Sequence, residues 1–146
     1  MKYFLCLLSI AFFVSDNVFA QSDILGVWYD SNKSGKIEIY KKNSKYFGKL
    51  VWLKDPIDED TGKPILDKEN PDKSKRDQPV DGLVILKDFE YDSKKEEFSG
   101  GTIYDPENGK TYKAKITLKD KNNLELRGYV GIPALGRTEK WTKTSN

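Results

Sequence analysis

The stretch TYKAKITL, residues 111–118, alternates between polar and apolar side chains at every position. Successive side chains of a β-strand point to opposite faces of a sheet, so this stretch predicts a strand with one dry face and one wet face. The dry face carries Tyr112, Ala114, Ile116 and Leu118. Such a strand covers a core on one side only, which is typical of an antiparallel sheet.

Seven further runs are rich in β-branched and aromatic residues and are separated by Gly, Asn, Asp and Pro, which favour turns. They are residues 26–30, 36–41, 46–54, 83–91, 97–104, 124–129 and 137–143. Mostly short connections predict an up-and-down order, and eight such strands can close into a barrel that is filled or holds one small ligand. The sequence therefore predicts an all-β, single-domain, eight-stranded antiparallel up-and-down β-barrel. An open sheet folded into a sandwich is the alternative.

The N-terminus has the pattern of a signal peptide. Lys2 precedes an apolar run over residues 3–14, and small residues end at Ala20 before Gln21. This apolar run has secretory rather than membrane-spanning length. We expect residues 1–20 to be removed and residues 21–146 to form the mature domain, periplasmic or secreted.

The composition excludes several kinds of chemistry. Cys6, the single cysteine, lies in the predicted signal peptide, and the chain has no histidine. Nucleophile systems that use histidine, and zinc sites built from imidazole and thiolate, are therefore absent from the mature domain. The 25 basic and 23 acidic residues are interspersed, which disfavours nucleic-acid binding. The acidic stretch 55–60 does not have the spacing of an EF-hand and is interpreted as a solvated turn rather than a calcium site. We expect no metal and no cofactor.

The last predicted strand places charged residues beside a tryptophan. Arg137, Glu139 and Trp141 share one face, so an inward Trp141 brings both charges inside, where they need partners. In one interpretation Arg137 stacks on Trp28 and closes the bottom of the barrel. In the other, Arg137 holds a carboxylate or phosphate of a ligand.

Short motifs carry a resemblance to known proteins. Gly26-Val27-Trp28 together with Arg137 resembles the glycine-x-tryptophan and partner arginine of lipocalin-like, or calycin, barrels. A more specific resemblance, to the uncharacterised secreted bacterial family called domain of unknown function 2147, covers nearly the whole mature chain. It rests on residues 26–28, 47–53, 67–72 with Arg76, 82–83, 100–106, 109–112, 127–132 and 136–141. The resemblance implies a lipocalin-like barrel in the bacterial envelope and brings no established reaction or ligand.

Residues 55–79 form a connection much longer than the others, so this segment is either disordered or a functional lid. Asn70 before a proline favours a defined turn. In one interpretation the polar side chains cap the loop's own backbone and Arg76 pairs with a carboxylate. In the other, the loop folds over the barrel mouth, where Asp67, Asn70 and Arg76 help to define a polar pocket.

These observations favour a non-catalytic envelope protein that binds a small hydrophobic or amphiphilic ligand in its barrel. The predicted ligand-binding residues are Asp67, Asn70, Arg76, Tyr104, Tyr112, Arg127, Tyr129, Arg137 and Trp141. One alternative is a structural or protein-interaction module, with an envelope protein as partner, a filled barrel and an exposed apolar patch such as residues 129–135. A less favoured alternative is a hydrolase that uses two carboxylates. The carboxylates available to it are Asp67, Asp105, Glu125 and Glu139.

Overall fold

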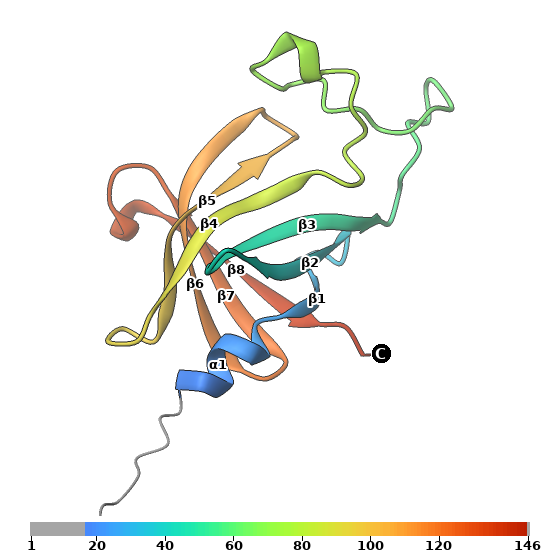
Figure 1. The fold of residues 1–146 in the computed structure, drawn as a ribbon. Coiled ribbons are helices and arrows are strands. Elements are labelled where there is room, and N and C mark those ends of the chain that lie inside the picture. Colours follow the sequence, from blue (N-terminus) through green and yellow to red (C-terminus); the bar gives the residue numbers. More distant parts are fainter. Residues whose placement is uncertain (1–16, 146) are drawn as a thin grey trace, which may run out of the picture.

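A computed structural model describes residues 17–145, and it confirms the predicted barrel. Eight antiparallel strands follow one another in chain order around a closed sheet (Figure 1). The first strand pairs with the last through Trp28 opposite Lys143 and Tyr29 opposite Thr142. This pairing closes the sheet, so the sandwich alternative is wrong.

The strands begin and end within two residues of the predicted bounds. The elements are α1 Asn17–Asp23, β1 Gly26–Tyr29, β2 Gly35–Lys42, β3 Lys45–Leu53, η1 Lys73–Lys75, β4 Val84–Asp92, β5 Glu97–Asp105, β6 Lys110–Asp120, β7 Asn123–Tyr129, η2 Pro133–Leu135 and β8 Arg137–Lys143. The tight β2–β3 hairpin turns at Asn43 and Ser44, both with positive φ, as the turn-forming residues predicted.

The two ends of the barrel differ. The short helix α1 lies at one end, together with the β2–β3, β4–β5 and β6–β7 turns (Figure 1). The long segment, residues 55–79, projects from the opposite end, which also holds the β1–β2, β5–β6 and β7–β8 connections. We call these the closed end and the open end.

Large side chains fill the closed half of the barrel. Tyr46 and Phe98 are buried, with ring centroids 4.9 Å apart in an edge-to-face arrangement. Phe89 is also fully buried, and its ring packs where a Cβ of Gly101 would stand. A strand glycine here allows the close approach of an aromatic ring. Aromatic side chains therefore fill the centre of the closed half.

A tryptophan and a lysine link the first strand, the last strand and the chain entering the barrel. Trp28 is fully buried, and its indole Nε1 donates to the carbonyl oxygen of Ile24 at 2.9 Å. Lys143 Nζ lies 5.1 Å from the centre of the Trp28 ring and donates to the Asp23 carbonyl at 2.6 Å. A cation over a tryptophan face is attracted by the ring quadrupole.

The expected stacking of Arg137 on Trp28 is therefore wrong. Strand β8 runs from the open end to the closed end, and Arg137 is its first residue. Lys143 lies six positions beyond Arg137 along the strand, a distance of roughly 20 Å. The cation that reaches Trp28 is Lys143, which is paired in register with it.

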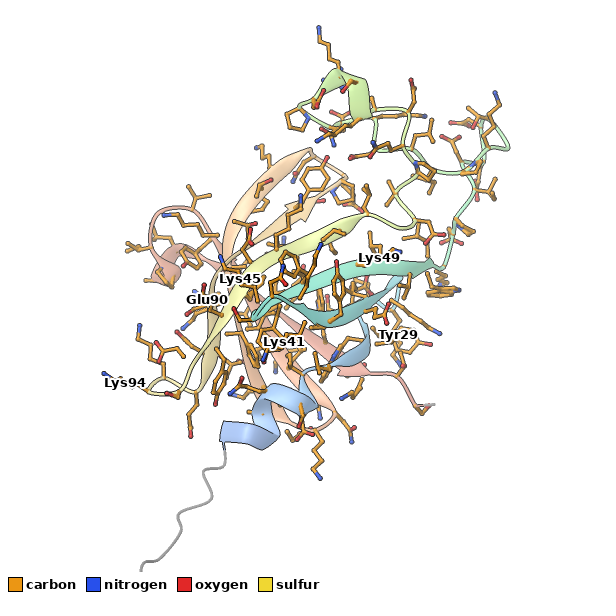
Figure 2. The ribbon with its side chains drawn as sticks, viewed as in Figure 1. Tyr29, Lys41, Lys45, Lys49, Glu90 and Lys94 are labelled. Carbon is orange, nitrogen blue, oxygen red and sulfur yellow. The ribbon has the colours of Figure 1, made fainter. Side chains whose placement is uncertain are left out.

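The outer surface is charged and mixed in sign. Lys45 of β3 and Glu90 of β4, for example, form an ion pair at 3.5 Å (Figure 2). Within residues 17–145, none of the helices is long and apolar enough to cross a membrane. Most of the predicted signal peptide, residues 1–16, lies outside the described residues, while Asn17 to Ala20 belong to α1.

Candidate functional site

The open half of the barrel contains a cavity of about 630 Å³. Its inner wall is apolar because inward-facing residues of neighbouring strands meet there. These residues include Ile37, Leu50, Ile85, Leu126 and Trp141. Gly128 of β7 leaves space at the same wall, since an added Cβ there would find no heavy atom closer than 3.6 Å. Sites for small molecules are commonly apolar clefts of roughly 300–1,000 Å³, and this cavity fits that class.

The rim of the cavity is polar and comes from connections at the open end. The β1–β2 turn supplies Asp30 and Asn32, and the β5–β6 turn supplies Asp105, Glu107 and Asn108. The turn chemistry fixes these positions. Asp105, for example, accepts from the Glu107 backbone N–H at 2.9 Å and from the Asn108 amide at 2.8 Å. The arrangement suits a molecule with an apolar part inside and a polar part at the rim.

Strand β8 sends three of its residues to the cavity, as the shared face predicted. Arg137, Glu139 and Trp141 all line it. The Trp141 indole donates to Glu139 Oε2 at 3.1 Å. In the described part of the chain, the guanidinium of Arg137 makes neither a hydrogen bond nor an ion pair. Tyr112 also lines the cavity, and its hydroxyl accepts from the Asn108 amide at 3.2 Å.

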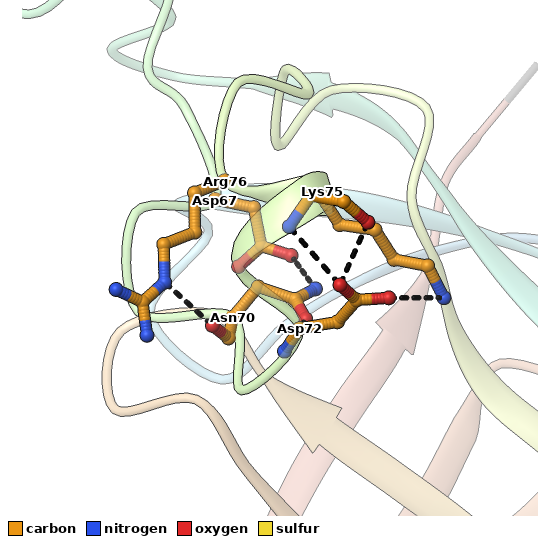
Figure 3. A network of polar contacts seen from close by, with 6 residues as sticks. Asp67, Asn70, Asp72, Lys75 and Arg76 are labelled. Atoms are coloured by element: carbon orange, nitrogen blue, oxygen red, sulfur yellow. Dashed lines mark hydrogen bonds and ion pairs between the residues drawn. The ribbon is translucent and has the colours of Figure 1, made fainter.

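The long segment is ordered and docks on the barrel through a buried carboxyl group. Asp67 is fully buried, with 0% of its surface exposed. It accepts from the Tyr104 hydroxyl at 2.6 Å. It also accepts from the Asn70 side-chain amide at 2.6 Å (Figure 3). Tyr104 belongs to β5, so these bonds tie the segment to the barrel wall. We call Asp67, Asn70 and Tyr104 the latch.

Burial raises the pKa of the Tyr104 hydroxyl, and the hydrogen bond that it donates to Asp67 raises it further. Both effects favour the protonated hydroxyl, the form that donates. The latch therefore uses Tyr104 as a donor throughout the neutral pH range.

Other contacts hold the segment against the cavity. Its residues Ile65 and Leu66, and Val80 just beyond it, line the cavity, and the Val80 N–H donates to the Ile65 carbonyl at 2.9 Å. The backbone of Glu69 packs against Gly109, leaving no room there for a Cβ. The segment is thus a wall of the cavity, rather than a disordered loop.

Within residues 17–145, Arg76 does not pair with a carboxylate. Its Nε donates to the backbone carbonyl of Asn70 at 2.8 Å, and the residue is exposed (Figure 3). Asp67, Asn70 and Arg76 thus lie together in the segment but do not line the cavity. They hold the cavity wall rather than forming a polar pocket.

Two predicted residues lie outside the cavity. Tyr129 does not line it, and neither does Arg127. Arg127 holds the β7–β8 connection from outside, donating to the carbonyls of Pro133 and Ala134 at 2.6 and 3.2 Å and to Thr138 Oγ1 at 2.6 Å. The strand alternation places Gly128 inward, so its two neighbours in sequence face outward.

The acidic stretch at the start of the long segment forms a turn. Asp58 Oδ1 accepts from the N–H groups of Asp60 and Thr61, and Oδ2 pairs with Lys68 Nζ at 3.1 Å. The hydrogen bond from Lys68 holds the pKa of Asp58 below its usual value. These bonds use the carboxylate within its own loop.

A second hollow of about 330 Å³ lies at the closed end. Ala20 and Asp23 of α1 contribute to its lining. Cleavage after Ala20 would remove one residue of that lining, Ala20, so the hollow loses part of its wall in the expected mature protein. We therefore place the candidate site at the open end.

An eight-stranded up-and-down barrel with one filled half and one apolar, open half defines a lipocalin-like protein. The chain belongs to the family described as an uncharacterised protein conserved in bacteria (DUF2147), whose pattern matches residues 26–143. The resemblance noted in the sequence is thereby confirmed.

A solved structure similar to this chain is titled "Protein HP1028 from the human pathogen Helicobacter pylori belongs to the lipocalin family". The two chains are 26% identical, with a TM-score of 0.70, and the match covers 84% of this chain and 83% of that one. Comparison with curated proteins gives no match.

Sequence reasoning missed two features of the site. The first is Gly128, whose missing side chain leaves part of the cavity open. Its inward position follows from the alternation with Leu124 and Leu126. The second is the acidic rim, because Asp30, Asp55 and Glu107 lie in three separate connections that only the closed barrel brings together.

Proposed function

We propose that this protein binds a small hydrophobic or amphiphilic molecule in the open half of its barrel. The observation that carries the proposal is the cavity of about 630 Å³, with an apolar inner wall and a polar rim. Burial of apolar ligand surface against Leu126 and Trp141 supplies the driving force, at about 25 cal/mol per Å². The polar rim orients the ligand.

We propose further that binding is not coupled to catalysis. Hydrolysis by two carboxylates requires a pair that flanks the bond to be cleaved. Asp67 is bound in the latch, and Asp105 is bound in its own turn. Glu125 forms an ion pair of 3.7 Å with Lys119 and does not line the cavity. Of these four carboxylates, only Asp105 and Glu139 line the cavity, and each accepts local hydrogen bonds, Asp105 in its own turn and Glu139 from the Trp141 indole.

We also propose that the protein works in the bacterial envelope. The support is the signal-peptide pattern over residues 1–20. Fractionation of bacteria that express the full chain tests this proposal. A mature form that begins at Gln21 in the periplasm or the medium is expected, and an unprocessed cytoplasmic chain contradicts the proposal.

Binding can be tested with the neutral fluorescent dye phenylnaphthylamine and two variants of one residue. Gly128→Leu fills the cavity, whereas Gly128→Ala adds one methyl group that has room at this wall. Dye binding is expected to weaken at least about tenfold in Gly128→Leu and to change less than about twofold in Gly128→Ala. Unchanged binding in a folded Gly128→Leu variant contradicts a ligand site in the barrel.

A second candidate function has its own observation. Three aliphatic side chains of the β7–β8 connection are strongly exposed: Val130 by 71%, Ile132 by 57% and Leu135 by 79%. Arg127 holds this connection in place. Exposed apolar surface that is held rigid is typical of a protein contact, which favours a role in binding an envelope protein.

Photo-crosslinking from position 132 in cells tests this second function. A crosslinked envelope protein, once purified, should bind the wild-type chain at least about tenfold more tightly than Leu135→Ser. Equal binding by the two chains contradicts it. Dye binding in the barrel should be the same in both.

A further inference from the structure

The charges around the cavity are strongly unbalanced. Its lining includes five acidic residues and a single basic one. The acidic residues are Asp30, Asp55, Asp105, Glu107 and Glu139, and the basic residue is Arg137. The whole chain, by contrast, has nearly equal numbers of acidic and basic residues. The excess of negative charge is therefore a property of this cavity, not of the protein surface in general.

The acidic side chains are not neutralised by neighbouring cations. Asp30 and Asp105 accept hydrogen bonds from uncharged donors of their own turns, Ser34 and Asn108 among them. Within residues 17–145, the carboxylates of Asp55 and Glu107 make no ion pair and no hydrogen bond. A cleft that is lined by one sign of charge beside apolar walls concentrates the opposite charge.

From these observations we infer that the ligand carries a positively charged head, as a single-chain amine or quaternary ammonium amphiphile does. This inference rests on the proposed function. The apolar chain occupies the space beside Leu126 and Trp141, and the cationic head lies at the rim near Asp55 and Glu107. An anionic head would meet several carboxylates and only Arg137 in compensation. The inference reverses the expectation that Arg137 holds a ligand carboxylate or phosphate.

Arg137 gives the sharpest test, because a cationic head and an anionic head predict opposite changes in ligand affinity when Arg137 loses its charge. If the head is cationic, Arg137 opposes binding, and Arg137→Gln binds the ligand more tightly. If the head is anionic, the same variant binds less tightly. Lys140→Gln is the matched control, since it removes the same charge from the same strand at an exposed position that does not line the cavity.

The probes are decyltrimethylammonium, decanol and decanoate, which share one chain length and differ in head charge. The ammonium and decanoate probes are added below their micelle concentrations and decanol below its solubility limit. Affinity is measured by displacement of phenylnaphthylamine. At about 50 mM salt the ammonium probe is expected to bind about tenfold more tightly than decanoate, and high salt should narrow the difference. Arg137→Gln should tighten binding of the ammonium probe about threefold, whereas Lys140→Gln should leave it within about 1.5-fold.

The three probes separate failure of the inference from failure of the proposed function. Equal binding of all three overturns the cationic head but leaves an apolar binding barrel in place. Preference for decanoate, lost in Arg137→Gln, also overturns the cationic head and restores the anionic one. If the dye and all three probes fail to bind the folded wild-type chain, both proposals are wrong.

Discussion

Replacement of Tyr104 by phenylalanine should release the long segment from the barrel. The Tyr104 hydroxyl donates to Asp67 at 2.6 Å, and Asp67 is fully buried. The variant keeps the ring and removes only the donor. Asn70 then remains as the side-chain donor to a carboxyl group that water does not reach.

The loss of stability expected in Tyr104→Phe follows from the burial of Asp67. Removing one partner of a buried polar group costs about 1–3 kcal/mol, because the other partner keeps its desolvation penalty. A loss of about 2 kcal/mol corresponds to a decrease in Tm of about 8 °C for a domain of this size. Tyr112→Phe is the matched control, since its hydroxyl makes one longer contact, 3.2 Å from an exposed amide. That variant should lose less than about 0.5 kcal/mol.

Urea unfolding and native-state hydrogen exchange measure this effect. Tyr104→Phe should lower the free energy of unfolding by the stated amount and speed exchange at the Asp67 N–H, which donates to the Gln78 carbonyl at 2.8 Å. Local opening of the segment explains faster exchange there than in the closed half of the barrel. If Tyr104→Phe matches Tyr112→Phe in both measurements, the latch does not hold the segment.

Three further predictions address pH, packing and the β7–β8 connection. The folded protein raises the pKa of Tyr104 above its unfolded value near 10, so the hydroxyl contributes its full stabilisation below pH 10 and loses it as pH rises further. The difference in free energy of unfolding between wild type and Tyr104→Phe should therefore shrink above about pH 10. A constant difference up to pH 11.5 contradicts this prediction. Gly101→Ala should lower the free energy of unfolding, measured in urea, by about 1–3 kcal/mol because its Cβ would overlap the Phe89 ring. Gly128→Ala, the control, should lower it by less than about 1 kcal/mol. Equal losses in the two variants would show that Phe89 moves freely. Arg127→Ala removes the donors that hold the β7–β8 connection, so limited proteolysis within residues 130–136 should become at least about tenfold faster, while dye affinity stays unchanged. An unchanged cleavage rate would show that Arg127 does not hold this connection.

The barrel was predictable because the sequence signals that determine its strands and turns are local. Alternation over residues 111–118 sets one face of β6, and turn formers such as Asn43 and Ser44 fix hairpins between neighbours in the chain. Each strand then pairs with the next one, so the order of strands follows without knowledge of distant contacts. The inward position of Arg137 and Trp141 came from the same alternation.

The parts that were missed depend on which strand ends meet. The cation over Trp28 is Lys143 rather than Arg137, a choice set by the direction of β8 and by barrel closure. Asp67 and Tyr104 meet across 37 positions of sequence, and no local pattern records that contact. The prediction of Arg127 as a ligand-binding residue was wrong for a different reason. The alternation that places Gly128 inward already places Arg127 outward, so the sequence held the information needed to leave Arg127 out.

Native mass spectrometry of residues 21–146, purified from a bacterial periplasm without detergent, tests the ligand-binding barrel most directly. The wild-type chain and Gly128→Ala are expected to carry a one-to-one adduct of small-molecule mass, and Gly128→Leu is expected to lack it. A bare wild-type mass after exposure to envelope extract, or an equal adduct on folded Gly128→Leu, would contradict a ligand in the cavity.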